Sequence, residues 1–429
     1  VVVFDRLDDF QHFTIGEDAA FFYPTPRANF MALVADDPDS LRLARHHYSH
    51  FLLRNFADLR LPRWFEEGLS AYLGRIDASD DGFRFQQYTA RNNEIMAQIS
   101  DMLSMDRLLY SAEALASPRV IQIANLKAES LNYFLRHGYL ERDFPDRREQ
   151  LQSYLQLLLA GRNHRFAYDR SFDVTTEELD EEFQRFLQQS RRPRVTVDMD
   201  LTVPAVGEAE QPPASEVVLS LGELALNAAR PDVAEIFFRR SIDAGGATAR
   251  SYSGLGDALR FQESAGRDRE IAALFERALN MAPDDLLIVL DYGEYWEAEL
   301  MDCEKTWSPA RRNQIMIEIE TSFSKALELA SQNAEVNLAM GQFYLLPGQD
   351  WQAGQEYQQK AFALLPADTF IMEQAAKYAI AAGDYERAES LIVEIAQPIH
   401  FFGEPGYVTK LRERMLRHRR GEDFDECSQ

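Results

Sequence analysis

Near the start of the chain, the hydrophobic positions favour strands. Val1–Phe4 is a short apolar run consistent with a buried strand, and Ala19–Tyr23 and Asn29–Val34 are two further runs rich in β-forming residues. Turn residues in Pro24–Arg27 separate the last two runs, which predicts a hairpin or a short meander. Asp8–Phe13 indicates a short helix. The pattern therefore predicts a small sheet with little helix before residue 36.

Helical spacing follows from Ser40. A helix is expected over Ser40–Phe56, because acidic residues and a serine precede it and such residues favour helix starts. A second helix is expected to begin near Pro62, since proline suits a first helical position. Ile76–Phe83 is polar and contains glycine, which predicts a loop. Further helices are predicted over 86–102, 120–137, 148–160 and up to Ser190 after the capping sequence at Thr175.

From Glu216 onward the helical pattern repeats. One equivalent position recurs as Leu221-Gly222, Leu255-Gly256, Tyr292-Gly293, Met340-Gly341 and Ala375-Ala376. The steps between these positions are 34 (256 − 222), 37 (293 − 256), 48 (341 − 293) and 35 (376 − 341) residues. This segment resembles tetratricopeptide repeats, whose period is about 34 residues. The resemblance implies five stacked helix pairs, the third with an insertion around Cys303 to Pro309, then a basic capping helix over Leu411–Arg420.

Charge and composition narrow the classes of partner. The net charge is −25, from 45 basic and 70 acidic residues, which disfavours nucleic acids and anionic membranes as partners. No apolar run approaches the roughly 18–20 residues that span a bilayer. The two cysteines, Cys303 and Cys427, form no metal-binding pattern, and their pairing is left open.

These patterns predict the order of the domains. Residues 1–190 form the first domain, a linker-like composition covers 191–215, repeats fill 216–420, and an acidic tail covers 421–429. The chain opens on a strand with no initiator methionine, so we expect residues upstream, with a targeting segment among them.

Two histidines and a glutamate carry the chemical signal of the chain. His46 and His50 are four residues apart, so on a helix they project from one face, one turn apart. Glu67, on the following helix, is the candidate third ligand. Two imidazoles and a carboxylate with an open fourth position form a catalytic zinc arrangement. The sequence therefore predicts one Zn²⁺ at these residues.

The residues around this set resemble those of the gluzincin metallopeptidases, in particular the bacterial peptidase MA-like group. That group has His-Glu-x-x-His followed by Leu-Pro-x-Trp-x-x-Glu-Gly-Leu-Ala-Glu-Tyr. This chain has HHYSH at 46–50 and LPRWFEEGLSAY at 61–72. The resemblance implies that His46, His50 and Glu67 are zinc ligands in an α+β zincin-like domain. It also implies a bacterial protein, of the periplasm or cell envelope, with a sheet edge beside the site that holds an extended peptide.

Three positions depart from the pattern of this family. His47 stands where the general-base glutamate is expected, and Ala71 replaces the last glutamate of the second motif. Lys127 stands where the family often has a tyrosine that polarises the substrate carbonyl. Glu66 is close in sequence, but because it adjoins a ligand on another helix we expect its side chain to point elsewhere.

Three hypotheses for the site follow from these departures. The site binds zinc without catalysis, or it is an active peptidase in which His47 replaces the usual base, or it binds no metal. The first hypothesis leads. It describes a catalytically degenerate metallopeptidase-like scaffold, an α+β zincin-like domain followed by an all-α tetratricopeptide-repeat solenoid that binds a protein partner. The alternative is an active zinc-dependent peptidase with an altered general base. The sequence leaves open the identity of the partner and the oligomeric state.

Overall fold

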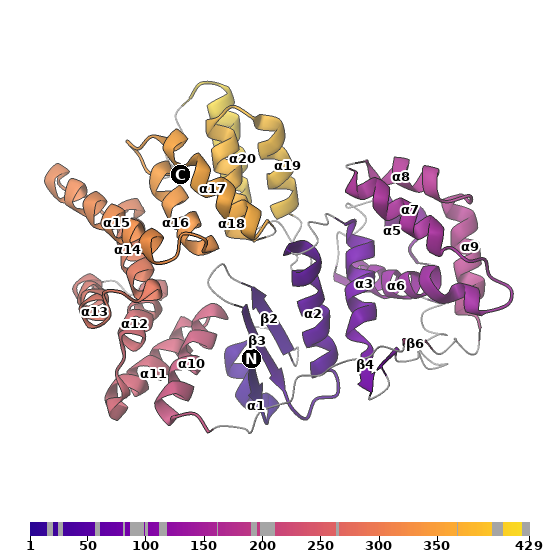
Figure 1. Ribbon diagram of the computed structural model, residues 1–429, viewed down its shortest axis with the longest axis horizontal. Coiled ribbons are helices and arrows are strands. Elements are labelled where there is room, and N and C mark those ends of the chain that lie inside the picture. Colours follow the sequence, from indigo (N-terminus) through magenta and orange to yellow (C-terminus); the bar gives the residue numbers. More distant parts are fainter. Residues whose placement is uncertain are drawn as a thin grey trace. The chain divides into compact units, whose positions relative to one another are not determined.

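A computed structural model gives the architecture of the chain (Figure 1). It describes residues 1–14, 20–24, 29–55, 61–79, 82–85, 98, 102–110, 118–160, 162–189, 195–197, 211–262, 266–366, 368–396 and 406–422. Residue contacts divide the chain into two units. The array unit comprises Val1–Asp36, Glu208–Pro398 and Gly403–Gln429, and the histidine unit comprises Asp37–Gly207.

The array unit begins with the predicted small sheet. Its strands β1 (Val2–Phe4), β2 (Ala20–Pro24) and β3 (Asn29–Val34) lie in the order β1-β3-β2. Strand β1 pairs with β3 in parallel, and β2 pairs with β3 antiparallel. The expected short helix is α1 (Leu7–Phe10), which a 3₁₀ turn over Gln11–Phe13 continues. The predictions of a hairpin and of a short helix before residue 36 are confirmed.

Five helix pairs follow in the described part of the array unit, as the repeat pattern predicts (Figure 1). They are α10 (Ala214–Asn227) with α11 (Pro231–Ser241), α12 (Ala249–Phe261) with α13 (Asp268–Met281), α14 (Leu286–Met301) with α15 (Pro309–Leu329), α16 (Ala334–Leu345) with α17 (Trp351–Leu364), and α18 (Thr369–Ala381) with α19 (Tyr385–Ile395). The extra residues of the third pair lengthen its helices, since α15 alone has 21 residues.

A glycine-to-phenylalanine contact sets the spacing within three successive pairs. Gly222 lies against Phe238, Gly256 against Phe275, and Gly293 against Phe323. A Cβ atom at Gly256 would stand 2.8 Å from a ring carbon of Phe275, closer than real Cβ contacts. A larger residue would therefore push the two helices apart. Three of the five recurring positions are thus positions where paired helices touch, and a fourth, Gly341, lies against Gln374 of the next pair.

The last described helix, α20 (Gly406–Arg419), covers the end of the array. Its buried residues Val408, Leu411 and Met415 share an apolar cluster with α18 and α19. The prediction of a capping helix is confirmed. Cys303 lies in the turn after α14, and Cys427 lies outside the described residues.

The first 36 residues pack with the repeats, which differs from the predicted domain of residues 1–190. The Phe13 ring stacks on Phe237 of α11 with 5.6 Å between the ring centroids. The Arg230 guanidinium donates a hydrogen bond of 2.9 Å to the carbonyl oxygen of His12. Phe4 and Phe10 belong to the same apolar core as the first helix pairs. The apolar side chains of the sheet are buried in this way, and local sequence patterns do not report such long-range contacts.

The histidine unit is mainly helical, with a small sheet. Its elements are α2 (Ser40–Asn55), α3 (Arg63–Gly74), β4 (Ile76–Ser79), β5 (Gly82–Phe85), α5 (Met105–Tyr110), α6 (Pro118–His137), a 3₁₀ turn (Gly138–Leu140), α7 (Arg148–Leu159), α8 (His164–Ser171), α9 (Thr176–Leu187) and β6 (Thr196–Val197). The predictions of helices α2, α3, α6, α7 and α9 are confirmed, and Thr175 forms the expected capping box with Glu178. None of the described helices combines the length and the hydrophobicity that a membrane span requires.

The loop predicted over Ile76–Phe83 is wrong. Strands β4 and β5 form an antiparallel hairpin there, and β6, from within the predicted linker, pairs with β5. Ile76 pairs with Phe85 and Ala78 with Phe83, so apolar residues of the two short strands lie opposite each other. The predicted helix over 86–102 and most of the linker lie outside the described residues.

Candidate functional site

Helices α2 and α3 bring the three predicted ligands together. His46 Nε2 lies 3.3 Å from His50 Nε2, and Glu67 Oε2 lies 3.8 Å from the first nitrogen and 4.0 Å from the second. One ligand atom from each residue falls within 4.8 Å of the others. This is the one group of three or more potential metal ligands within the described residues. The structure thus places His46, His50 and Glu67 close together, as the sequence predicts.

The separations agree with the size of a zinc ion. Two nitrogens at about 2.0–2.1 Å from a tetrahedral zinc stand about 3.3 Å apart, which matches the separation of the two Nε2 atoms. Glu67 Oε2 would need to approach by about half an ångström, which a carboxylate rotation can supply. The same distance between the imidazoles also suits an N–H···N hydrogen bond. The donor set therefore fits a zinc ion, and it also has a metal-free form.

A buried polar stripe on α3 faces the two histidines. Glu66 and Glu67 are 3% and 1% exposed, and Ser70 is fully buried. Ser70 is four residues from Glu66 and three from Glu67, so it lies between them on the helix surface, and the three form one polar row about 100° wide. Burying carboxylates is costly unless they are paired, hydrogen-bonded or bound to a cation. These carboxylates are therefore stable only with positive charge or hydrogen-bond donors opposite them, and the imidazoles of His46 and His50 on α2 lie there.

The structure corrects the expectation for Glu66. Its carboxylate does not point away from the site, because Oε1 lies 2.9 Å from His50 Nδ1. It therefore stands behind the ring, on the side opposite the Nε2 atom that faces Glu67. A glutamate beside another glutamate in sequence gives no local sign of which histidine it reaches. Only the packing of α2 on α3 decides it.

His46 is held by a backbone group of α3. The backbone of Ser70 forms a hydrogen bond with the ring, and burial lowers the pKa of His46 to about 2. Neighbouring positive charges lower this pKa further, whereas the Ser70 bond raises it. His46 is therefore a neutral imidazole at physiological pH, the form that can donate a lone pair to a metal.

His47 occupies the general-base position without joining the metal-capable group. Its ring stands 5.3 Å from the His46 ring, nearly perpendicular to it. Burial, with the charges of His50 and Arg42, lowers the pKa of His47 to about 4. A residue one step along a helix is turned by about 100°, which accounts for its separate direction. No carboxylate stands at this position of α2.

Lys127 is part of the core and not a substitute for the tyrosine of the family. It is fully buried, and its Nζ donates hydrogen bonds of 2.7 Å to both the Leu103 carbonyl and Asp180 Oδ1. These contacts link α6 to α9 and to the segment before α5. At the position where the family often has a tyrosine, this chain therefore has an amine that is engaged in a structural ion pair.

The framing residues of the motif are core residues. Trp64 is buried in the apolar cluster of the histidine unit, and Gly68 lets α3 approach the Ala128 carbonyl of α6. The Tyr72 ring stacks on Phe85 with 4.3 Å between the centroids, and its hydroxyl lies 2.7 Å from His137 Nε2. These contacts hold α3 in place, so the motif fixes the helix that carries Glu67.

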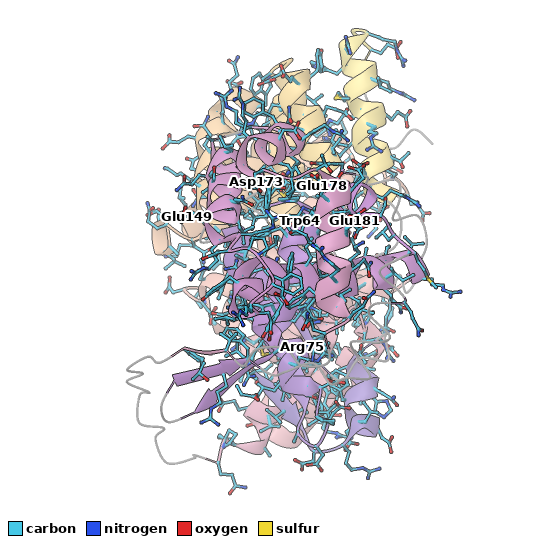
Figure 2. The ribbon with its side chains drawn as sticks, turned by 90° about the vertical axis from the view of Figure 1, so that its right-hand side faces the viewer. Trp64, Arg75, Glu149, Asp173, Glu178 and Glu181 are labelled. Carbon is cyan, nitrogen blue, oxygen red and sulfur yellow. The ribbon has the colours of Figure 1, made fainter. Side chains whose placement is uncertain are left out.

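A hollow in the histidine unit has a volume of about 360 Å³ and lies between α5, α8 and the start of α9. Its rim is acidic and includes Asp173 and Glu178, both labelled in Figure 2. The acids have local roles, because Asp173 pairs with Arg147 at 3.0 Å and Glu178 completes the capping box. Helix starts and ion pairs thus account for its charge.

Comparison with known proteins bears on the repeats. Neither the protein-family models nor the curated proteins compared with the chain gave a match. Among solved structures, the chain is similar to a thermophilic tetratricopeptide-repeat protein of Thermus thermophilus, with 17% identity and a TM-score of 0.38. The similarity covers 48% of this chain and 99% of that chain. The five helix pairs, three of them with the same glycine-to-phenylalanine contact, themselves identify a helical region of tetratricopeptide-like repeats.

Proposed function

We propose that the chain is a catalytically degenerate, metallopeptidase-like scaffold that holds one zinc ion and binds a protein partner through its repeat array. The observation that carries this proposal is the convergence of His46, His50 and Glu67 beside a position 47 that lacks a carboxylate. Binding needs the three ligands, whereas peptide hydrolysis also needs a base for the metal-bound water.

The contacts of the remaining carboxylates support loss of catalysis. Glu67 supplies a ligand atom, and Glu66 is engaged by His50 Nδ1. Neither is placed as the glutamate of a His-Glu-x-x-His helix is. A positioned general base contributes about 10²–10⁴-fold to rate. Without it, the zinc would polarise a bound water or carbonyl but lack the group that moves the proton.

The array supports a role in binding a protein. Stacked helix pairs form an extended surface suited to a peptide or a partner helix. The sequence also lacks the glycine-rich motifs that cradle phosphates. The resemblance to bacterial peptidases favours a bacterial protein of the cell envelope.

Metal analysis of the purified chain tests the proposal. About one zinc per chain is expected in the wild type and none in a His46→Ala/His50→Ala double variant. His47→Ala is the matched control, since it removes a neighbouring imidazole outside the ligand set, and it should keep its zinc. A wild type that takes up no zinc when zinc is supplied would contradict the proposal and favour the third hypothesis, histidines without a metal.

The second candidate function is an active zinc peptidase in which His47 carries the proton. The imidazole at the general-base position is the observation in its favour. Cleavage of unstructured peptides by the wild type, stopped by a chelator and absent from His47→Ala, would establish it. No cleavage above that of the double histidine variant is expected under the scaffold proposal.

The site of partner binding can be tested with the same double variant. A pull-down with the full chain should recover the partner equally well with and without the two histidines, if the array provides the surface. Full-length chain is required, because residues 1–36 pack with the repeats. Loss of the partner in the double variant would assign binding to the histidine unit.

A further inference from the structure

Glu66 is a buried carboxylate in contact with the back of a proposed ligand. Its side chain is 4% exposed, and its Oε1 lies 2.9 Å from His50 Nδ1. On the other side of the same ring, His50 Nε2 faces His46 Nε2 at 3.3 Å and Glu67 Oε2 at 4.0 Å. One imidazole therefore bridges a supporting carboxylate and the ligand group.

This contact selects one form of the ring. An ionised carboxylate only accepts hydrogen bonds, so Nδ1–H donates to Glu66. In the neutral imidazole the other nitrogen then keeps its lone pair, and that nitrogen is Nε2. The direction of the lone pair is toward His46 and Glu67, where the metal would bind. Without Glu66 the ring could place its proton on either nitrogen and rotate about its side-chain bond.

The charge balance of the proposed zinc site also indicates a supporting role for Glu66. Glu66 and Glu67 are two buried carboxylates next to each other, and burial makes unpaired charge costly. With neutral histidines and a zinc ion, the two carboxylates balance the two charges of the metal. An amide at position 66 would leave this buried group with a net charge of about +1. The second carboxylate thus suits a divalent cation better than no cation at all.

We propose that Glu66 is a positioning residue for the metal: its carboxylate fixes the His50 tautomer and supplies the second compensating charge. This inference rests on the proposed zinc site and deepens it. The other histidine has a different support, because His46 is held by the backbone of Ser70, which no substitution removes. Glu66 is therefore the support that mutation can test.

Glu66→Gln is the test, because it keeps shape and removes charge. We expect its zinc affinity, measured by competition with a chromophoric chelator, to fall about 10–100-fold. The matched control is Glu129→Gln, which removes a carboxylate that is also buried in the histidine unit but pairs with Arg75. The control should bind zinc within about threefold of the wild type. Far-UV circular dichroism verifies that both variants fold.

A second measurement does not depend on the metal. In the metal-free wild type, the ¹⁵N chemical shifts of His50 should report a protonated Nδ1 and an unprotonated Nε2, and Glu66→Gln should shift this pattern toward a mixture. A bond that only stabilises the fold would lower the melting temperature without a selective loss of zinc affinity. Equal affinities for Glu66→Gln and Glu129→Gln would overturn the role of Glu66 alone, whereas a wild type that binds no zinc overturns the zinc site as well.

Discussion

One helix pair from each unit packs closely through a glycine, but the side chains buried at the two interfaces differ in polarity. The pair α12 and α13 in the array unit meets through Gly256 and the Phe275 ring, with apolar neighbours. The pair α2 and α3 in the histidine unit meets through Gly74, where a Cβ would stand 2.8 Å from the Arg42 carbonyl. Its interface buries two glutamates and a histidine. Close packing alone therefore does not account for the polar face of α3.

The energetic terms of the two interfaces have opposite signs. Burial of a phenylalanine side chain contributes about 1.5–3 kcal/mol to stability. Burial of a carboxylate costs free energy unless its partners compensate. A helix pair that needed only stability could use the apolar solution of the array. The polar interface of α2 and α3 therefore supports the proposal that these residues bind a metal ion.

Position 47 gives the largest expected effect. In a His47→Glu variant a carboxylate returns to the general-base position, so peptidase activity should rise by about 10²–10⁴-fold over the background of the wild type. His47→Gln is the control of the same size without a base, and it should show no gain. The measurement is cleavage of a fluorogenic peptide with and without a chelator. If Glu and Gln variants were equally inactive, a further part of the catalytic site would be missing, and Ala71 would be the next position to restore.

The apolar interface should respond through stability. Phe275 is 1% exposed and fills the space beside Gly256, so Phe275→Ala should lower the free energy of unfolding by about 3–5 kcal/mol. Phe261 on α12 is 55% exposed, and Phe261→Ala should change it by less than about 0.5 kcal/mol. Urea unfolding followed by circular dichroism measures both. Zinc content should remain as in the wild type, and a loss of zinc in Phe275→Ala would mean that the two units do not respond separately.

A Lys127→Met variant tests whether a buried polar group outside the histidine cluster also affects zinc affinity. Lys127→Met removes an amine bonded to Leu103 and Asp180, and should lower the free energy of unfolding by about 2–3 kcal/mol. The expected value is at the low end because Asp180 is partly exposed and can regain water. Zinc affinity, determined by chelator competition, should not change. A tenfold loss of affinity with unchanged stability would instead connect Lys127 to the metal.

The smallest effect concerns a cap in the array. Burial raises the pKa of Asp368 from 3.8 to about 6, although its carboxylate accepts hydrogen bonds from the backbone of Phe370 and Ile371 at the start of α18. A carboxyl pKa that is raised in the folded state means that the contribution of Asp368 to stability is most favourable below pH about 4 and is lost as pH rises through 6. Asp368→Asn keeps a good cap, so it should stabilise the chain by about 1–2 kcal/mol at pH 8 and not at pH 4. Thermal melts of both proteins at pH 4 and pH 8 measure this difference in stability. An equal effect of Asp368→Asn at both pH values would contradict the raised pKa of Asp368.

The sequence predicted the parts of the molecule that depend on local periodicity. The histidines four apart on α2 and the glycines of the array lie where helical spacing puts them. The support of His50 by Glu66 was not predictable, because it depends on how α2 packs against α3. Nor was the placement of residues 1–36, whose partners stand about two hundred positions further along the chain. The hairpin β4–β5 was missed because its strands have only four residues each, and the glycine and polar residues of this stretch favoured a loop.

The array unit is built from residues on both sides of the histidine unit in the sequence, and this has a consequence for synthesis. The sheet ends by Asp36 and the first array helix begins at Ala214, so 177 residues (214 − 36 − 1) separate them. A ribosome that adds about 5–20 residues per second needs roughly 10–40 s to cover this distance. During that interval the aromatic side chains Phe4, Phe10 and Phe13 are without the repeats that bury them. The growing chain thus exposes an apolar segment that chaperones can bind. A pause in translation within the histidine unit would lengthen the exposure of these aromatic side chains.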